Sequence, residues 1–222
     1  MHLRAHHLPL TTIALLLAVP ARAQVMTAPA PRIRYGIVAG LNFAKLGGGD
    51  VTGSGSRTGF VGGAYLDKPL GAGLSLRPAL LLSLEGASTD GVDGGDTSGS
   101  LKLDYLRLPI LVRYAFPTPG STHPFIALGP SVGVRVGCAL TGSSQGASGS
   151  ISCKDANDFL SGGFDTKPVV VAGRIEAGLD FAAGSETVTV GAGYTHGLTK
   201  ALEVLGAVAR NRVWTVYAGV TF

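Results

Sequence analysis

The 222-residue chain has few charged residues and no long hydrophobic run in its body. Charged residues make up 14% of it, against about 25% in an average soluble protein. Because apolar residues make up 45%, the composition excludes a disordered chain. Its 34 glycines follow no Gly-X-Y period, which excludes collagen. Low charge combined with high glycine content favours an all-β protein that need not be water-soluble.

The chain also lacks the motifs on which most catalytic sites are built. It contains no G-x-S-x-G, no H-E-x-x-H and no P-loop sequence. Outside the N-terminal segment the histidines are His123, in an expected short turn, and His196, at an expected strand end. We expect them at opposite rims, so they cannot share a Ser/His/Asp site. The sequence therefore predicts no enzyme and no cofactor.

Metal ligands are equally sparse. Asp90, Asp93 and Asp96 lie in a glycine-rich stretch and could offer carboxylate oxygens to Ca²⁺. The stretch lacks EF-hand spacing and a closing glutamate, so a solvated acidic loop is the better interpretation. Cys138 and Cys153 have no histidine nearby to complete a zinc site. We therefore expect no metal.

The N-terminus has the layout of an export signal. Residues 1–23 combine a basic start, an apolar stretch from Leu8 to Val19 and an A-x-A site at 21–23. About 12 apolar residues are too few for a helix that crosses a membrane of roughly 30 Å. We expect a signal peptide at 1–23, a short periplasmic segment at 24–33 and one domain at 34–222. Losing Arg4 and Arg22 lowers the net charge from +4 to +2, and no basic cluster remains that would indicate nucleic acid as a partner.

The two cysteines, Cys138 and Cys153, are the only ones in the chain. An exported protein meets an oxidising compartment, where a disulfide is stable. Such a bridge would close a loop of about 15 residues and stabilise it by up to about 3 kcal/mol. We predict this bridge, with two free thiols as the alternative.

Apolar residues recur with a period of two in eight segments, the pattern of β-strands with one apolar and one small or polar face. In the third segment, for example, Leu80, Leu82 and Leu84 alternate with Leu81, Ser83 and Glu85. The predicted strands are 35–43, 58–68, 74–85, 103–116, 125–138, 168–181, 187–197 and 212–222.

The connections alternate in length. Short turns follow the even strands, whereas long stretches rich in Gly, Ser and Asp follow the odd ones. This sorting is typical of an up-and-down barrel in an outer membrane. Because hydrocarbon offers no partner for backbone groups, the sheet must close on itself. The sequence thus predicts an all-β, eight-stranded antiparallel transmembrane β-barrel with outer-membrane lipid as its surroundings and with periplasmic termini.

The charged residues within the strands are expected to point into the barrel, because charge facing lipid is costly. Eight strands leave an interior that side chains can just fill, and inward glycines would make room for long ones (Gly129, Gly133, Gly137, Gly191 and Gly193). One interpretation is a path for protons or a ligand; the favoured one is an ion-pair network that fills a closed lumen. With five arginines against three acids, some arginines should meet water. The predicted lumen charges are Arg77, Glu85, Arg107, Arg113, Arg135, Arg174, Glu176 and Asp180.

Aromatic residues near strand ends suggest the two girdles at which a barrel meets the membrane interfaces. Ordinary strand composition is the alternative. The residues are Tyr35, Tyr114, Phe116, Phe125, Phe181, Trp214 and Phe222.

Several segments resemble the PorT-like outer-membrane β-barrel family. The most specific is 105–116 (YLRLPILVRYAF), centred on Pro109; others are 36–43 (GIVAGLNF) and 74–85 (LSLRPALLLSLE). The resemblance covers roughly residues 34–222 and implies an eight-stranded outer-membrane barrel. The family usually has an acidic residue two positions before the proline, where this chain has Arg107. One member is associated with protein secretion, a role that the resemblance does not carry to this chain.

Together these features predict an integral outer-membrane barrel with a filled lumen and a structural or interaction role through its extracellular loops. A protein partner outside or in the periplasm is possible, and the longest loop, 139–167, is the expected contact surface; within it, 155–159 could form a short helix. One alternative is a soluble lipocalin-like carrier with its apolar face turned inward. The other is a small barrel enzyme, which would need reactive residues clustered at the outer rim.

Overall fold

The computed structural model describes residues 32–47, 55–89, 97–144, 147–159, 161, 163–204 and 207–222. They belong to one compact unit, Pro31–Phe222, and the unit Met1–Ala30 precedes it. The predicted signal peptide at 1–23, most of the segment 24–33, and Asp90, Asp93 and Asp96 lie outside the described residues. No helix among the described residues is long and apolar enough to span a membrane.

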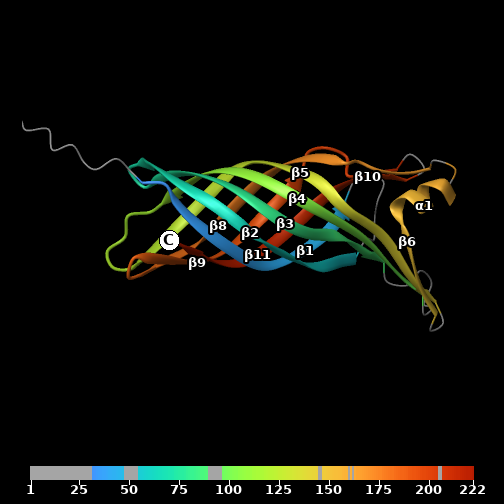
Figure 1. The fold of residues 1–222 in the computed structure, drawn as a ribbon, viewed down its shortest axis with the longest axis horizontal. Coiled ribbons are helices and arrows are strands. Elements are labelled where there is room, and N and C mark those ends of the chain that lie inside the picture. Colours follow the sequence, from blue (N-terminus) through green and yellow to red (C-terminus); the bar gives the residue numbers. More distant parts are fainter. Residues whose placement is uncertain are drawn as a thin grey trace, which may run out of the picture. The chain divides into compact units, whose positions relative to one another are not determined.

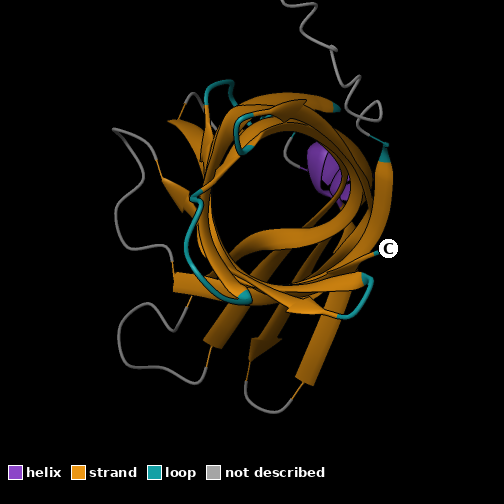
Figure 2. Ribbon diagram, turned by 90° about the vertical axis from the view of Figure 1, so that its left-hand side faces the viewer, coloured by secondary structure: helices purple, strands orange, loops and turns teal. Residues whose placement is uncertain are grey.

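Eight long antiparallel strands form a closed barrel, as the sequence predicted (Figure 1). Each pairs with its neighbours in the chain, and β11 returns to pair with β1, from Gly36 opposite Thr221 to Gly47 opposite Arg210. Figure 2 looks along the barrel and shows the strands closing into a ring. The strands are β1 (Arg34–Gly47), β2 (Gly55–Gly71), β3 (Leu74–Thr89), β4 (Thr97–Ala115), β5 (Thr122–Ser144), β8 (Val169–Ala183), β9 (Glu186–Gly197) and β11 (Ala207–Thr221).

The period of two decides which face of each strand turns outward. On β3, Leu80 and Leu82 are exposed while Ser83 and Glu85 are buried. The same alternation runs along the other strands, so the barrel has an apolar exterior and a polar interior through most of its length. This is the reverse of the apolar interior that a soluble carrier needs.

Short turns gather at one end of the barrel, here called the short-turn end. Two residues, Ala72 and Gly73, join β2 to β3, and both have positive φ, as does Gly71 before them. Two more residues join β8 to β9, with Gly184 at φ +67°. Glycine adopts this backbone conformation without steric cost. The connection between β4 and β5, residues 116–121, lies at the same end, where the Ala115 backbone N–H donates to the Gly73 carbonyl. The remaining connections lie at the opposite, long-loop end.

The longest connection is more ordered than a plain loop. It contains β6 (Ala147–Ser152), α1 (Cys153–Phe159) and β7 (Phe164–Thr166). Ser152 caps the helix: its hydroxyl accepts a hydrogen bond from the Asp155 backbone N–H at 3.2 Å and donates to the Asp155 carboxylate at 2.8 Å. The predicted helix at 155–159 is therefore present and begins two residues earlier.

A bulge in β5 changes which side chains enter the barrel. Tyr105 of β4 pairs with Arg135, whereas Asp104, the residue before Tyr105, pairs with Gly137. Val136 therefore has no partner on β4 and is the extra residue of the bulge. Beyond it the alternation reverses. Gly137 lies beside the outward Asp104 side chain, which corrects its predicted inward position, and Cys138 lies opposite the inward Leu103.

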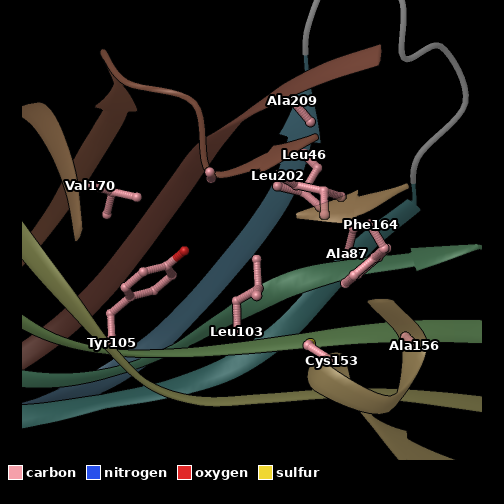
Figure 3. Close-up of a cluster of buried hydrophobic side chains, with 11 residues drawn as sticks. Leu46, Ala87, Leu103, Tyr105, Cys153, Ala156, Phe164, Val170, Leu202 and Ala209 are labelled. Atoms are coloured by element: carbon pink, nitrogen blue, oxygen red, sulfur yellow. The ribbon is translucent and has the colours of Figure 1, made fainter. Parts of the chain in front are cut away.

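The long-loop end of the barrel has an apolar core (Figure 3). We call α1, β7 and β10 (Leu202–Val204) the cap. β7 pairs with β10, and β10 pairs with β11. The cap and the barrel wall bury a common set of side chains: Leu46, Ala87, Leu103, Tyr105, Cys153, Ala156, Phe164, Val170, Ala201, Leu202 and Ala209.

Candidate functional site: the barrel lumen and its cap

The lumen contains three groups of paired charges, one above another. The group nearest the short turns joins four strands. Arg77 of β3 pairs with Asp67 of β2, with Nε 3.2 Å from Oδ2. Arg113 of β4 pairs with Asp180 of β8, whose other oxygen accepts the Thr189 hydroxyl at 2.8 Å. Both pairs are almost fully buried.

Aromatic rings pack against the same two arginines. The guanidinium of Arg77 lies 4.4 Å from the centre of the Tyr65 ring, and that of Arg113 lies 4.0 Å from the Phe125 ring. Such cation–π contacts help to hold a desolvated charge. Phe125 is only 1% exposed, so its assignment to the interfacial girdle was wrong. It occupies an inward position of β5 and supports the lumen charge.

The middle group lies on β8. Arg174 Nε donates to Glu176 Oε1 at 2.6 Å, and Arg174 Nη1 donates to the Thr195 hydroxyl at 3.0 Å. The Tyr217 hydroxyl donates to Glu176 Oε2 at 2.8 Å. Gly193 makes room for this group, because a Cβ there would lie 3.2 Å from both Arg174 and Glu176 atoms.

The group nearest the long loops is centred on Glu85 of β3. Arg107 of β4 donates hydrogen bonds to both carboxylate oxygens, from Nε to Oε1 and from Nη2 to Oε2, the latter at 2.6 Å. Asn211 Nδ2 also donates to Oε2, at 2.8 Å, and the Ser83 hydroxyl donates to Oε1 at 2.7 Å. The network continues from Ser83 to Asn42 and then to Thr215 across β1 and β11. The network centred on Glu85 therefore joins β3 and β4 to β1 and β11, the first and last strands of the barrel.

Asp67 is the lumen acid that the sequence reasoning missed. It is fully buried and alternates with the outward Leu66, so the pattern on β2 could have identified it. Its presence changes the expected arginine surplus, because four arginines now face four acids. The fifth, Arg135, is half-buried and donates to the Thr166 carbonyl at 2.8 Å, which links the barrel wall to the cap.

The space left between these side chains is small. A cavity of about 40 Å³ lies in the lumen, bordered by Arg77, Arg174, Glu176 and Tyr217 among others. One water molecule needs about 10–15 Å³ on this measure. This cavity therefore has room for a few waters.

The cap is joined to the barrel covalently. Cys138 of β5 and Cys153 of α1 form a disulfide, with their Cα atoms 5.5 Å apart. Lys167, which follows β7, donates to Asp165 at 2.5 Å, and this hydrogen bond raises the pKa of the Lys167 ammonium. Both groups are exposed, so this pair contributes little to holding the cap in place.

Reactive side chains are not gathered in the part of the chain that the structure describes. No three His, Cys, Asp or Glu residues there are placed to hold a metal ion. His123 lies at the short-turn end, where Thr118 contacts its ring at 3.2 Å. His196 lies near the far end of β9, beside Tyr194.

One comparison with known proteins gives the family of this chain. The family model described as outer membrane protein beta-barrel domain matches residues 22–203. No curated protein sequence matches the chain. Solved structures similar to it include Neisserial surface protein A, with 14% identity, 84% of this chain and 95% of that chain covered, and a TM-score of 0.49.

Two further similar structures come from other bacteria. Ail, the attachment invasion locus protein of Yersinia pestis, is 14% identical over 85% of this chain and 98% of its own, with a TM-score of 0.40. OprG from Pseudomonas aeruginosa is 13% identical over 86% and 94%, with a TM-score of 0.44. Identities this low carry no information about what this chain binds.

Proposed function

Because the chain belongs to the outer membrane protein beta-barrel domain family, we propose that it is a closed, non-conducting barrel that presents its long-loop end to partners outside the cell. Its location in the outer membrane follows from the family. The closed lumen and the interaction role are the proposal.

The pairing of the lumen charges is the observation that carries this proposal. Four arginines and four acids neutralise one another, and each of the three groups has hydrogen bonds to at least one uncharged side chain. A transport path needs groups that exchange partners easily, whereas buried, neutral pairs are costly to break. The lumen is thus suited to holding the barrel rigid.

The cap supports the second half of the proposal. It buries an apolar core against the barrel wall, while Phe159 of α1 is 84% exposed. Ile151 of β6, the strand directly before α1, is 48% exposed. Their strands and helix extend from the end of the barrel at which the long loops gather. Exposed apolar side chains on such an anchored surface are suited to contact with another protein.

We also infer that the chain belongs to the PorT-like group within this family. The support is the segment 105–116 with its central Pro109. Arg107 stands where that group usually has an acid, and here it pairs with Glu85 of the neighbouring strand. In this chain β4 therefore supplies the basic partner of the ion pair, and β3 supplies the acidic one.

The test is ion conductance of the purified full chain in planar lipid bilayers. We expect no stable conductance steps from the wild-type barrel, while a 16-stranded porin reconstituted in the same way conducts. Reductant should leave the barrel closed, because the three ion-pair groups do not depend on the disulfide. Reproducible steps of fixed size from the wild-type protein would overturn the closed-lumen proposal.

A further inference from the structure

Three aromatic side chains form a row on the outer face of β1, β11 and β9. Phe43 is directly opposite Trp214, and Trp214 is directly opposite Tyr194. The ring centres of Tyr194 and Trp214 are 4.8 Å apart, and Trp214 is 61% exposed. Aromatic rings in such a position mark the interface between hydrocarbon and headgroups.

A second aromatic pair marks the other edge of the apolar band, so the spacing between the pair and this row gives the thickness of the band. Tyr35 and Phe222 stack at 5.5 Å near the short-turn end, eight positions from Phe43 and Trp214 on the same strands. Eight residues of tilted strand span about 20 Å along the membrane normal, close to the apolar band of about 25 Å in such barrels. The row on β1, β11 and β9 therefore lies at the long-loop interface.

Basic residues lie immediately beyond that row. Two positions further along the same strands, Lys45 is opposite Arg212, and Arg212 is opposite His196. Arg210 follows, opposite Gly47, and all four side chains are exposed. We call Lys45, His196, Arg210 and Arg212 the basic cluster. It lies at headgroup depth, directly above an apolar surface that includes Leu41 and Val216.

The cluster has no acidic counterpart among the described residues. Lys45, Arg210 and Arg212 make no ion pair there, whereas Glu203 of β10 lies 3.5 Å from Lys200. Like charges directly opposite each other destabilise a strand pair. On the other side of the barrel, outward charges of both signs alternate on β4, with Lys102 two residues from Asp104. Within the described residues, the clustering on β1, β11 and β9 is therefore a positive surface without an acidic partner, which an anion would stabilise.

We propose that the basic cluster binds the headgroup phosphates of a phosphorylated lipid in the outer leaflet. Outer-membrane barrels place their long loops outside the cell, so the cluster faces that leaflet. The guanidinium groups of Arg210 and Arg212 form charge-assisted hydrogen bonds to phosphate. The acyl chains lie against the apolar face below, past the rings of Trp214 and Tyr194. The site belongs to the barrel wall and does not depend on the role proposed for the loops.

The experiment is native mass spectrometry of the full-length barrel mixed with equal amounts of diphosphorylated lipid A and fully dephosphorylated lipid A. The wild-type barrel should retain the phosphorylated lipid selectively. Replacing Lys45, Arg210 and Arg212 by glutamine should weaken that retention about 100-fold, since each basic group near an anionic lipid surface contributes roughly a fivefold factor. Added inorganic phosphate should not displace the lipid.

A matched control removes three exposed lysines elsewhere, two on the barrel and one on α1, with Lys68→Gln, Lys102→Gln and Lys154→Gln together. This control should retain the lipid as the wild-type protein does. Gel mobility before and after boiling shows whether each variant is folded. Equal retention by the two triple variants, no preference for the phosphorylated lipid, or displacement by inorganic phosphate would each overturn the proposal.

Discussion

At the scale of single residues, the lumen charges are arranged so that no inward guanidinium lacks an acceptor. Glu85 illustrates the arrangement best, because it accepts from Arg107, Asn211 and Ser83 at once. Removing one member of a buried ion pair leaves the other charge without compensation and typically costs about 3–5 kcal/mol. The stability of the barrel should therefore depend strongly on individual lumen residues.

We expect Glu85→Gln to lower the free energy of unfolding by about 3 kcal/mol or more, because Arg107 stays buried and charged without its partner. The measurement is urea unfolding from lipid vesicles, followed by the fluorescence of Trp214, the only tryptophan. Trp214 is exposed on the outer face, so its emission reports loss of contact with lipid.

The matched control is Glu203→Gln, which removes a partly exposed acid that lies 3.5 Å from Lys200. Exposed pairs of this kind contribute less than about 1 kcal/mol. If both substitutions changed the unfolding free energy equally, the lumen pairs would not be the source of stability that the structure indicates.

At the scale of elements, the cap is a small folded layer fixed to the end of the barrel. It is held by the disulfide, by the pairing of β10 with β11 and by the apolar core around Leu103 and Phe164. Only the disulfide is covalent, and it closes a segment whose ends are 15 residues apart. Removing it should loosen the cap and leave the barrel beneath unaffected.

We expect Cys138→Ser with Cys153→Ser to increase protease cleavage within 139–167. A disulfide that closes a loop of this length stabilises its folded form by about 3 kcal/mol, and the double variant loses this stabilisation. The barrel should still migrate faster on a gel before boiling than after it. Wild-type protein treated with reductant should give the same cleavage pattern. The control Lys154→Gln, on α1, should not increase cleavage. Unchanged cleavage in the double variant would show that the bridge does not hold the cap.

At the scale of the whole molecule, strand closure and loop length together determine how the barrel sits in the membrane. The two ends differ, with the short connections β2–β3, β4–β5 and β8–β9 at one end and the cap at the other. Short turns face the periplasm in outer-membrane barrels. The cap and the basic cluster then face the outside of the cell.

This orientation is tested with single cysteines introduced at exposed positions. We expect Ser150→Cys, in β6, to react with a membrane-impermeant maleimide in intact cells. Ser121→Cys, between β4 and β5, should react only after the outer membrane is permeabilised. The native cysteines do not interfere, because both are in the disulfide. The reverse labelling pattern would mean that the barrel is inserted the other way.

The sequence by itself determined the class of fold, because a period of two is a local property. Each apolar residue at an alternate position specifies an outward face, and each glycine-rich stretch specifies a connection. The eight strands and the location in the outer membrane could be predicted in this way, and so could most of the inward charges, although Asp67 was missed. Strand ends were less accurate: β5 continues to Ser144, beyond the predicted end at 138.

The tertiary structure decided what depends on neighbours distant in the chain. The bulge at Val136 turns Cys138 inward and Gly137 outward, and only the register with β4 reveals it. Asp67 becomes the partner of Arg77, and Phe125 packs beneath Arg113. The basic cluster arises because closure of the barrel places β11 between β1 and β9. Alternation along one strand assigns faces, but only the pairing of strands decides which side chains meet.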